Sequence, residues 1–345
     1  MAAETASVGS GRTAEAPDIA RHVLHSLALR HGREAILPLV VVVMIAVFSL
    51  LSDVFLTVPN FRNVGVAAAA LAAVSFGQTF AILTAGLDLS IGAAVALVSV
   101  TSALAMRRYG IPAGIGTALA VGCLAGLVNG LVVAKLKVFP FIATLATMSI
   151  MSGLALQLSA GVPVTGVPDS FSNLAYDRLF GIPMPVVIAL LVLVVAALIL
   201  RYTRVGRHIY AVGGNEEAAR LSGIAIDRVK LFAYVLSGLC AAVGSLILTA
   251  RVASGQPSLG TSLPLEAVSA VVLGGVSLFG GRGSVIGVAF GVLFVSILSN
   301  GLNLLNVSSY TQMMVIGVAL IVAVAVDQAF SGKRSSDRRS DVSLN

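Results

Sequence analysis

Long apolar segments alternate with short polar ones along most of the chain. A hydrocarbon layer about 30 Å thick requires about 20 apolar residues per crossing helix. Ten segments approach that length, and the eighth of them is short and ends in glycines: 35–55, 64–85, 87–106, 110–134, 139–160, 184–203, 230–250, 265–280, 284–306 and 310–328. The pattern predicts an all-α polytopic membrane protein with about ten transmembrane helices and discontinuous glycine-rich segments.

Composition supports a membrane protein and removes other classes. The chain is 57% hydrophobic and 11% charged, whereas a soluble domain carries about 25% charged residues. Its net charge of +7 comes from basic residues beside apolar segments, so we expect contact with membrane lipid and no nucleic-acid binding. Cys123 and Cys240 each lie inside an apolar segment, which is typical of small core residues.

The distribution of basic residues predicts an orientation. With both termini in the cytosol, most of the 22 Lys and Arg residues fall on the cytosolic side, as the positive-inside rule requires. Arg107 and Arg108 are the local exception. We expect a disordered cytosolic tail over 1–34, a transmembrane domain over 35–330 with a cytosolic loop at 204–229, and a cytosolic tail over 331–345.

The segment "GGNEEAARLSG", 213–223, is charged where its surroundings are apolar. Asn215 suits a helix N-cap, and acids in the first turn favour the helix dipole. Arg220 follows Glu216 by four residues, the favoured order for an ion pair, and Gly223 suits a C-terminal stop. The segment predicts a capped helix of about two turns, either a simple solvated loop helix or a docking site for a cytosolic partner.

The segment "TAGLDLSIG", 84–92, joins two apolar segments and contains an acid at or near membrane depth. Such a carboxylate is tolerated where it faces protein or water rather than lipid. Two interpretations remain open for Asp88: it caps the third helix by accepting N–H groups near Ser90 and Ile91, or it lines a solute path.

A second glycine-rich segment, "GGVSLFGGRGSVIG", occupies 274–287. Residues 86–92 and 281–287 share both end glycines and the Ile before the last. The same shift along the chain carries the first four predicted spans onto the last four. This pattern is consistent with an internal repeat, a frequent feature of transporters.

Several catalytic motifs are missing from the sequence. It contains no P-loop, no HExxH and no Gly-x-Ser-x-Gly elbow, so we expect no catalytic residues, no metal site and no cofactor. Polar residues within the spans are candidates either for helix–helix hydrogen bonds or for a solute path: Gln78, Asp88, Ser90, Asn129, Thr144, Asn300 and Asn303.

Several of these segments resemble the permease subunits of ribose-type ABC importers, which carry monosaccharides and related polyols. The resemblance covers nearly all of the chain after the first tail. It rests on "FLTVPNFRNV" (55–64), "TAGLDLSIGA" (84–93), "FPFIATLATMSIMSGLA" (139–155), "YAVGGNEEAARLSGI" (210–224) and "VVLGGVSLFGGRGSVIG" (271–287).

The resemblance implies a bacterial inner-membrane importer in which two permease copies work with a cytosolic ATPase subunit and an extracytoplasmic sugar-binding protein. It also implies that the short cytosolic helix inserts into the ATPase, and it assigns this coupling role to Gly214, Asn215, Glu216, Glu217, Arg220, Leu221 and Gly223. ATP hydrolysis would then take place outside this chain.

Two departures from the family pattern leave substrate detail open: Pro264-Leu265-Glu266 where Glu-Leu-Asp is usual, and Ser152-Gly153 where an Arg often precedes the Gly. The alternatives are a secondary transporter that works alone, for which Asp88 is the strongest ion-coupling candidate, and a membrane enzyme, which the missing catalytic groups disfavour. Gradient-driven uptake without an ATPase would distinguish the first alternative.

Overall fold

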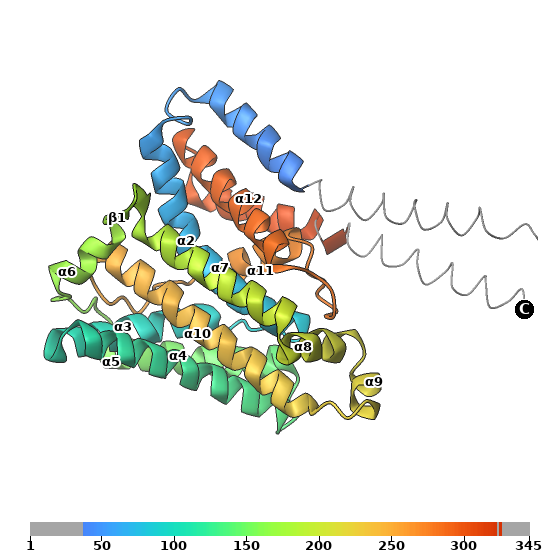
Figure 1. The fold of residues 1–345 in the computed structure, drawn as a ribbon. Coiled ribbons are helices and arrows are strands. Elements are labelled where there is room, and N and C mark those ends of the chain that lie inside the picture. Colours follow the sequence, from blue (N-terminus) through green and yellow to red (C-terminus); the bar gives the residue numbers. More distant parts are fainter. Residues whose placement is uncertain (1–36, 323, 326–345) are drawn as a thin grey trace, which may run out of the picture.

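The computed structural model describes residues 37–322 and 324–325, and these residues form a helical membrane bundle (Figure 1). Seven of the described helices are long and apolar enough to cross a membrane: α2 (Val58–Leu83), α3 (Ile91–Tyr109), α4 (Ile111–Ala134), α5 (Pro140–Ser159), α7 (Met184–Tyr202), α10 (Ile226–Val252) and α12 (Val285–Leu304). Three shorter apolar helices cover Leu37–Leu51, Leu263–Leu273 (α11) and Ser309–Val322. The predicted all-α membrane fold is confirmed, and the predicted tails 1–34 and 331–345 lie outside the described residues.

The eighth predicted span, 265–280, is not one continuous helix. Its helix, α11, has 11 residues, which at 1.5 Å per residue is about half of a crossing. The helix ends at the Gly274–Gly275 pair, and Gly275 has φ +82°, a conformation that side chains other than glycine rarely adopt. The chain then forms an irregular segment that returns to the start of α12.

The helix that corresponds to the third predicted span, 87–106, begins and ends a few residues later in the chain than predicted. α3 begins at Ile91 and continues through Tyr109, so Arg107 and Arg108 belong to its last turn. Cations at this position complement the negative end of the helix dipole. The pair that conflicted with the positive-inside rule therefore has a local reason to be there.

The long helix α10 forms the centre of the bundle and packs against α2, α3 and α4. Small residues allow the approach of α4 and α10: a Cβ placed on Gly122 would lie 2.5 Å from the carbonyl oxygen of Gly238. Such close backbone contact is a usual way for helices to associate in lipid. In Figure 1, α3, α4 and α5 lie on one side of α10, and α11 and α12 lie on the other.

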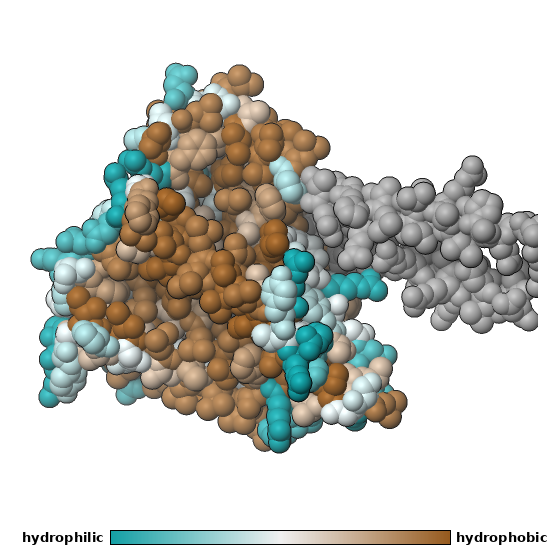
Figure 2. All heavy atoms as spheres, viewed as in Figure 1, coloured by the Kyte–Doolittle hydropathy of each residue, from teal (hydrophilic) through white to brown (hydrophobic). Residues whose placement is uncertain are grey.

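The outer face of the bundle is apolar. On α7, the side chains of Leu191, Val194 and Leu198 are all exposed, and their spacing places them on one face of the helix. Figure 2 shows apolar residues over most of the visible face and hydrophilic residues toward its edges. This distribution fits a protein surrounded by hydrocarbon.

The connection between α5 and α7 contains small elements that the sequence pattern did not predict. They are α6 (Asp169–Ser172), the 3-10 helix η1 (Asn173–Ala175) and a two-stranded antiparallel hairpin of β1 (Arg178–Leu179) and β2 (Ile182–Pro183). Val164 and Gly255 form an isolated bridge, which ties this connection to the residues that follow α10.

The predicted loop 204–229 contains two helices rather than one. α8 (Arg204–Gly214) precedes α9 (Glu216–Leu221), and α10 already begins at Ile226. Thr203 caps α8 by accepting the N–H of Gly206 at 3.1 Å. The internal repeat stays a prediction, although the shift that aligns the two glycine motifs also carries α3 onto α12.

Candidate functional site: an exposed helix, a glycine junction and a polar cavity

The ends of α9 agree with the capping signals in the sequence. The Asn215 side chain accepts the N–H of Ala218 at 2.9 Å. At the other end, Gly223 has φ +78° and donates its N–H to the carbonyl of Arg220 at 2.9 Å. These local bonds define a rigid helix of six residues, shorter by a residue or two than the sequence predicted.

Charged pairs hold α9 in place and leave its tip free. Arg220 lies 3.6 Å from Glu216 and 3.4 Å from Glu217, and Lys230 of α10 lies 2.7 Å from the other oxygen of Glu216. Leu221 is 82% exposed. This apolar side chain is therefore accessible at the end of a charged helix that is held to the bundle.

α8 joins α9 to the bundle, and nothing in the sequence pattern had singled it out. Its buried residues include Ile209 and Val212. The hydroxyl of Tyr210 donates to the carbonyl of Gly283 at 2.9 Å, and burial raises the pKa of this hydroxyl, so it remains a donor. Amphipathic periodicity over 204–214 was the signal that could have identified the helix.

Three backbone segments meet at the C-terminal end of α8, in a contact that we call the glycine junction: Leu83, Gly213 and Gly281. The N–H of Gly281 donates to the carbonyl of Leu83 at 2.9 Å. A Cβ on Gly213 would overlap that carbonyl oxygen and lie 2.6 Å from the nitrogen of Gly281. The end of α8 thus contacts both glycine-rich segments, those that precede α3 and α12.

Asp88 lies in a buried hydrogen-bond network and is only 2% exposed. Its Oδ1 accepts the N–H of Ser90 at 3.1 Å and the Ser90 hydroxyl at 2.5 Å, and its Oδ2 accepts the Ser237 hydroxyl at 2.9 Å. Asn129 donates to the Ser90 hydroxyl oxygen at 2.7 Å and accepts from Thr147 at 2.6 Å. The network connects the start of α3 with α4, α5 and α10.

Two more predicted path residues hold the backbone of the same turn. With its amide turned so that both of its polar groups find a partner, Gln78 donates to the carbonyl of Asp88 at 3.1 Å and accepts its N–H at 3.2 Å. The hydroxyl of Thr144 lies 3.2 Å from the carbonyl of Leu87. Gln78, Asp88, Ser90, Asn129 and Thr144 are therefore gathered around one turn, with their polar groups bonded to protein.

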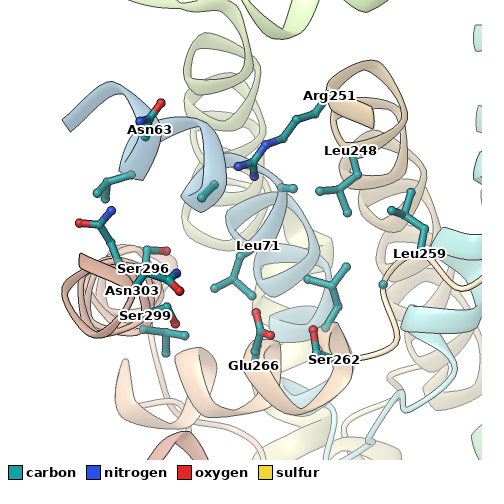
Figure 3. Close-up of a pocket in the computed structure, with 17 residues that line it drawn as sticks. Asn63, Leu71, Leu248, Arg251, Leu259, Ser262, Glu266, Ser296, Ser299 and Asn303 are labelled. Carbon is teal, nitrogen blue, oxygen red and sulfur yellow. The ribbon is translucent and has the colours of Figure 1, made fainter. Parts of the chain in front are cut away.

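A cavity of about 390 Å³ lies at the opposite end of these helices, between α2, α10, α11 and α12. Its volume is within the range of about 300–1,000 Å³ typical of small-molecule sites. Asn63 comes from the first turns of α2, Arg251 from the last turn of α10, and Ser262 and Glu266 from the start of α11. Figure 3 shows Arg251 and Glu266 extending toward the same space from opposite sides.

α12 lines one wall of the cavity with four polar residues: Ser296, Ser299, Asn300 and Asn303. Asn300 exchanges two hydrogen bonds with Asn60, of 2.9 and 3.0 Å. The Oδ1 of Asn303 accepts from Gln312 at 2.8 Å. Of the two predicted path residues in the cavity, Asn300 is thus bonded through both its amide nitrogen and its amide oxygen. Asn303 is bonded through its side-chain oxygen.

The predicted path residues did not include six polar residues of the cavity: Asn63, Arg251, Ser262, Glu266, Ser296 and Ser299. Glu266 carried the clearest signal, because it is the only acid in the predicted span 265–280. Arg251 counted only toward the distribution of basic residues along the chain. Within the described residues, no group of three or more His, Cys, Asp or Glu side chains is arranged to hold a metal ion.

Comparison with known proteins gives consistent matches over most of the chain. Residues 60–324 match the family described as "Branched-chain amino acid transport system / permease component". The ribose import permease protein of Haemophilus influenzae is 40% identical over 298 residues, which are 85% of this chain and 92% of that protein. The ribose import permease protein of Escherichia coli (strain K12) is 43% identical over 293 residues, 83% and 90% of the two chains.

A permease named for another sugar is similar over a comparable length. The L-arabinose transport system permease protein of Escherichia coli (strain K12) is 39% identical over 275 residues, 79% of this chain and 84% of that protein. No solved structure matches the chain. The matched region 60–324 contains α9, the glycine junction and every residue that lines the cavity.

Proposed function

The chain belongs to the family of ribose-type ABC importer permeases, and from this membership we propose how it works within a transport complex. It is a multi-pass permease subunit, and it moves a small sugar or polyol that an extracytoplasmic binding protein delivers. A separate cytosolic subunit hydrolyses ATP and docks on α9. Two copies of the chain form the transport unit.

The exposed, capped helix α9 is the observation that carries this proposal. A six-residue helix contributes little to the stability of a bundle this size, yet both of its ends are capped and its charges are paired. Rigidity of this kind is what a docking element needs, because little entropy is lost when the partner binds. Leu221 supplies the apolar contact at its tip.

Basic residues near α9 support a cytosolic position for this end of the molecule. Lys135 and Lys137 follow α4, Arg201 lies in the last turn of α7, and Arg204 and Arg207 lie on α8. From the positive-inside rule we infer that both termini lie in the cytosol as well. The cavity, at the other end of α2 and α10, faces the extracytoplasmic side, where the binding protein releases its solute.

The docking role predicts that Leu221→Asp abolishes capture of the ATPase. Leu221 is almost fully exposed, so the change adds a charge to the proposed interface without disturbing the fold. Loss of an apolar anchor and burial of an unpaired charge should lower affinity about tenfold or more. The measurement is ATP hydrolysis recovered with tagged permease pulled from native membranes, together with uptake by the reconstituted complex.

Leu179→Asp is the matched control, because Leu179 is an exposed leucine of the hairpin between α5 and α7. It should leave ATPase recovery unchanged. Equal recovery with Leu221→Asp and the parent would refute docking at α9. Solute uptake driven by an ion gradient without any ATPase would instead favour a secondary transporter.

A further inference from the structure

Six of the polar side chains that line the cavity differ from those around Asp88 in having no protein partners among the described residues. Among the described residues, no hydrogen bond or ion pair is found for the side chains of Asn63, Ser262, Ser296, Ser299, Arg251 and Glu266. In the Asp88 network, by contrast, carboxylate, amide and hydroxyl groups bond to one another. Polar groups left open toward a cavity are available to a solute.

Two opposite charges are part of this open set. Arg251 and Glu266 line the same space, but no ion pair within 4.0 Å joins them. In Figure 3 the guanidinium extends from α10 and the carboxylate from α11, with the cavity between them. Each group keeps its hydrogen-bonding capacity, five donors on Arg and about four acceptor sites on Glu.

Helix dipoles explain why Arg251 and Glu266 are stable at their helix ends, but they do not explain why both side chains point into the same cavity. Glu266 lies in the first turn of α11 and Arg251 in the last turn of α10, and each sign suits its helix end. The helix dipole favours each of these charges whichever way its side chain points, including toward water. The two helices instead direct the pair toward one cavity, partly open to solvent, with four neutral polar side chains.

We propose that Arg251 and Glu266 together bind the solute on the extracytoplasmic side of the path, and that this cavity selects a neutral polyhydroxylated molecule. This inference rests on the proposed function. The two charges cancel, so the cavity attracts neither anions nor cations overall. Vicinal hydroxyls both donate and accept, and they match a carboxylate on one side and a guanidinium on the other.

The neutral polar residues strengthen the assignment to a polyol. Asn63, Ser262, Ser296 and Ser299 add hydroxyl and amide groups around the charged pair, enough for a solute with several hydroxyls. A zwitterionic amino acid is the competing occupant, because its ammonium and carboxylate would also match Glu266 and Arg251. It would leave most of the neutral polar groups bonded to water alone, so it matches fewer groups of the cavity than a solute with several hydroxyls does.

The test uses a cysteine reporter in the cavity wall. Ala67 lines the cavity with a small apolar side chain, so Ala67→Cys reports occupancy without removing a proposed contact. The parent carries Cys123→Ala and Cys240→Ala, and it is prepared with its ATPase in lipid nanodiscs. The rate of labelling by a polar maleimide is measured against increasing D-ribose and, separately, L-leucine, with Val162→Cys on the exposed connection as the unprotected reference.

We expect D-ribose to slow labelling at position 67 and L-leucine to have no effect. Glu266→Gln and Arg251→Gln, each added to the reporter, should raise the ribose concentration for half-protection about tenfold or more, because each removes charged hydrogen bonds. Asp169→Asn and Arg178→Gln are the matched controls, since both residues are exposed on the connection between α5 and α7. They should leave protection unchanged.

Three results would overturn the inference. Protection by leucine and not by ribose would assign the cavity to amino acids. Unchanged protection in both charge variants would remove Arg251 and Glu266 from binding. If no solute slows the labelling, while the same preparation still imports ribose with ATP, the solute binds elsewhere and the proposed function stands. If ATP-dependent import itself fails, that result counts against the proposed function.

Discussion

At the scale of single residues, Asp88 shows how a carboxylate is retained inside a membrane protein without a basic partner. Four protein groups surround it: the N–H and hydroxyl of Ser90, the hydroxyl of Ser237 and, at 3.4 Å, the amide of Asn129. Hydrogen bonds of this kind offset the cost of removing a charge from water. The bond to the N–H of Ser90 is the contact expected of a cap, and the others reach distant helices.

The role of Asp88 can be tested with Asp88→Asn. An amide oxygen in the place of Oδ1 still accepts the N–H and the hydroxyl of Ser90, and the hydroxyl of Ser237 can turn to accept from the NH₂ group. We expect a stability loss of about 1 kcal/mol and near-normal uptake, measured by thermal unfolding of the purified protein and by transport in vesicles. Asp88→Leu, which leaves these donors unpaired, should fold poorly. A stable Asp88→Asn protein without uptake would instead assign Asp88 to the solute path.

At the scale of elements, the glycine junction connects the end of α8, which α9 follows, to the glycine-rich segments that precede α3 and α12. α9 follows α8 directly, and the end of α8 touches the carbonyl of Leu83 and the backbone of Gly281. A displacement of α9 therefore reaches the turns that precede α3 and α12. This contact offers a physical route by which a cytosolic event could change the bundle.

Gly213→Ala tests the junction, because a methyl group there would overlap the Leu83 carbonyl. Relieving the overlap must separate α8 from both turns, and overpacking of this kind costs about 1–3 kcal/mol. We expect a lower thermal midpoint and reduced uptake. Gly214→Ala is the neighbouring control for stability, since nothing lies within 4 Å of its added Cβ, and its midpoint should stay close to that of the parent. Equal midpoints for the two variants would contradict the close contact.

At the scale of the whole molecule, the basic residues around α8 and α9 and the apolar belt predict which end faces the cytosol. Ser222→Cys, next to α9, should react with an impermeant thiol reagent only after cells are opened. Ser170→Cys, in the connection between α5 and α7, should react in sealed cells. Both positions are exposed, and the unmodified chain controls for Cys123 and Cys240. Labelling at position 222 in sealed cells would reverse the proposed orientation.

The sequence by itself determined those features that depend on neighbouring residues. Runs of apolar residues located the crossing helices, because the thickness of the bilayer fixes their length. Asn215 and Gly223 defined the ends of α9 because a cap acts within one turn of the helix. The motifs around 84–92 and 210–224 were sufficient to identify the family before any contact was known.

The tertiary structure alone decided which polar residues are bonded to protein and which remain open. Asp88 and Ser237 meet across 149 positions of the chain, and no local pattern records such a pairing. Asn300 belongs to the cavity wall, yet its amide is bonded to Asn60, 240 positions away, whereas Arg251 and Glu266 remain without a bonded partner among the described side chains. The same residue types serve either role, because packing between distant helices determines whether a polar group meets a partner or an open cavity.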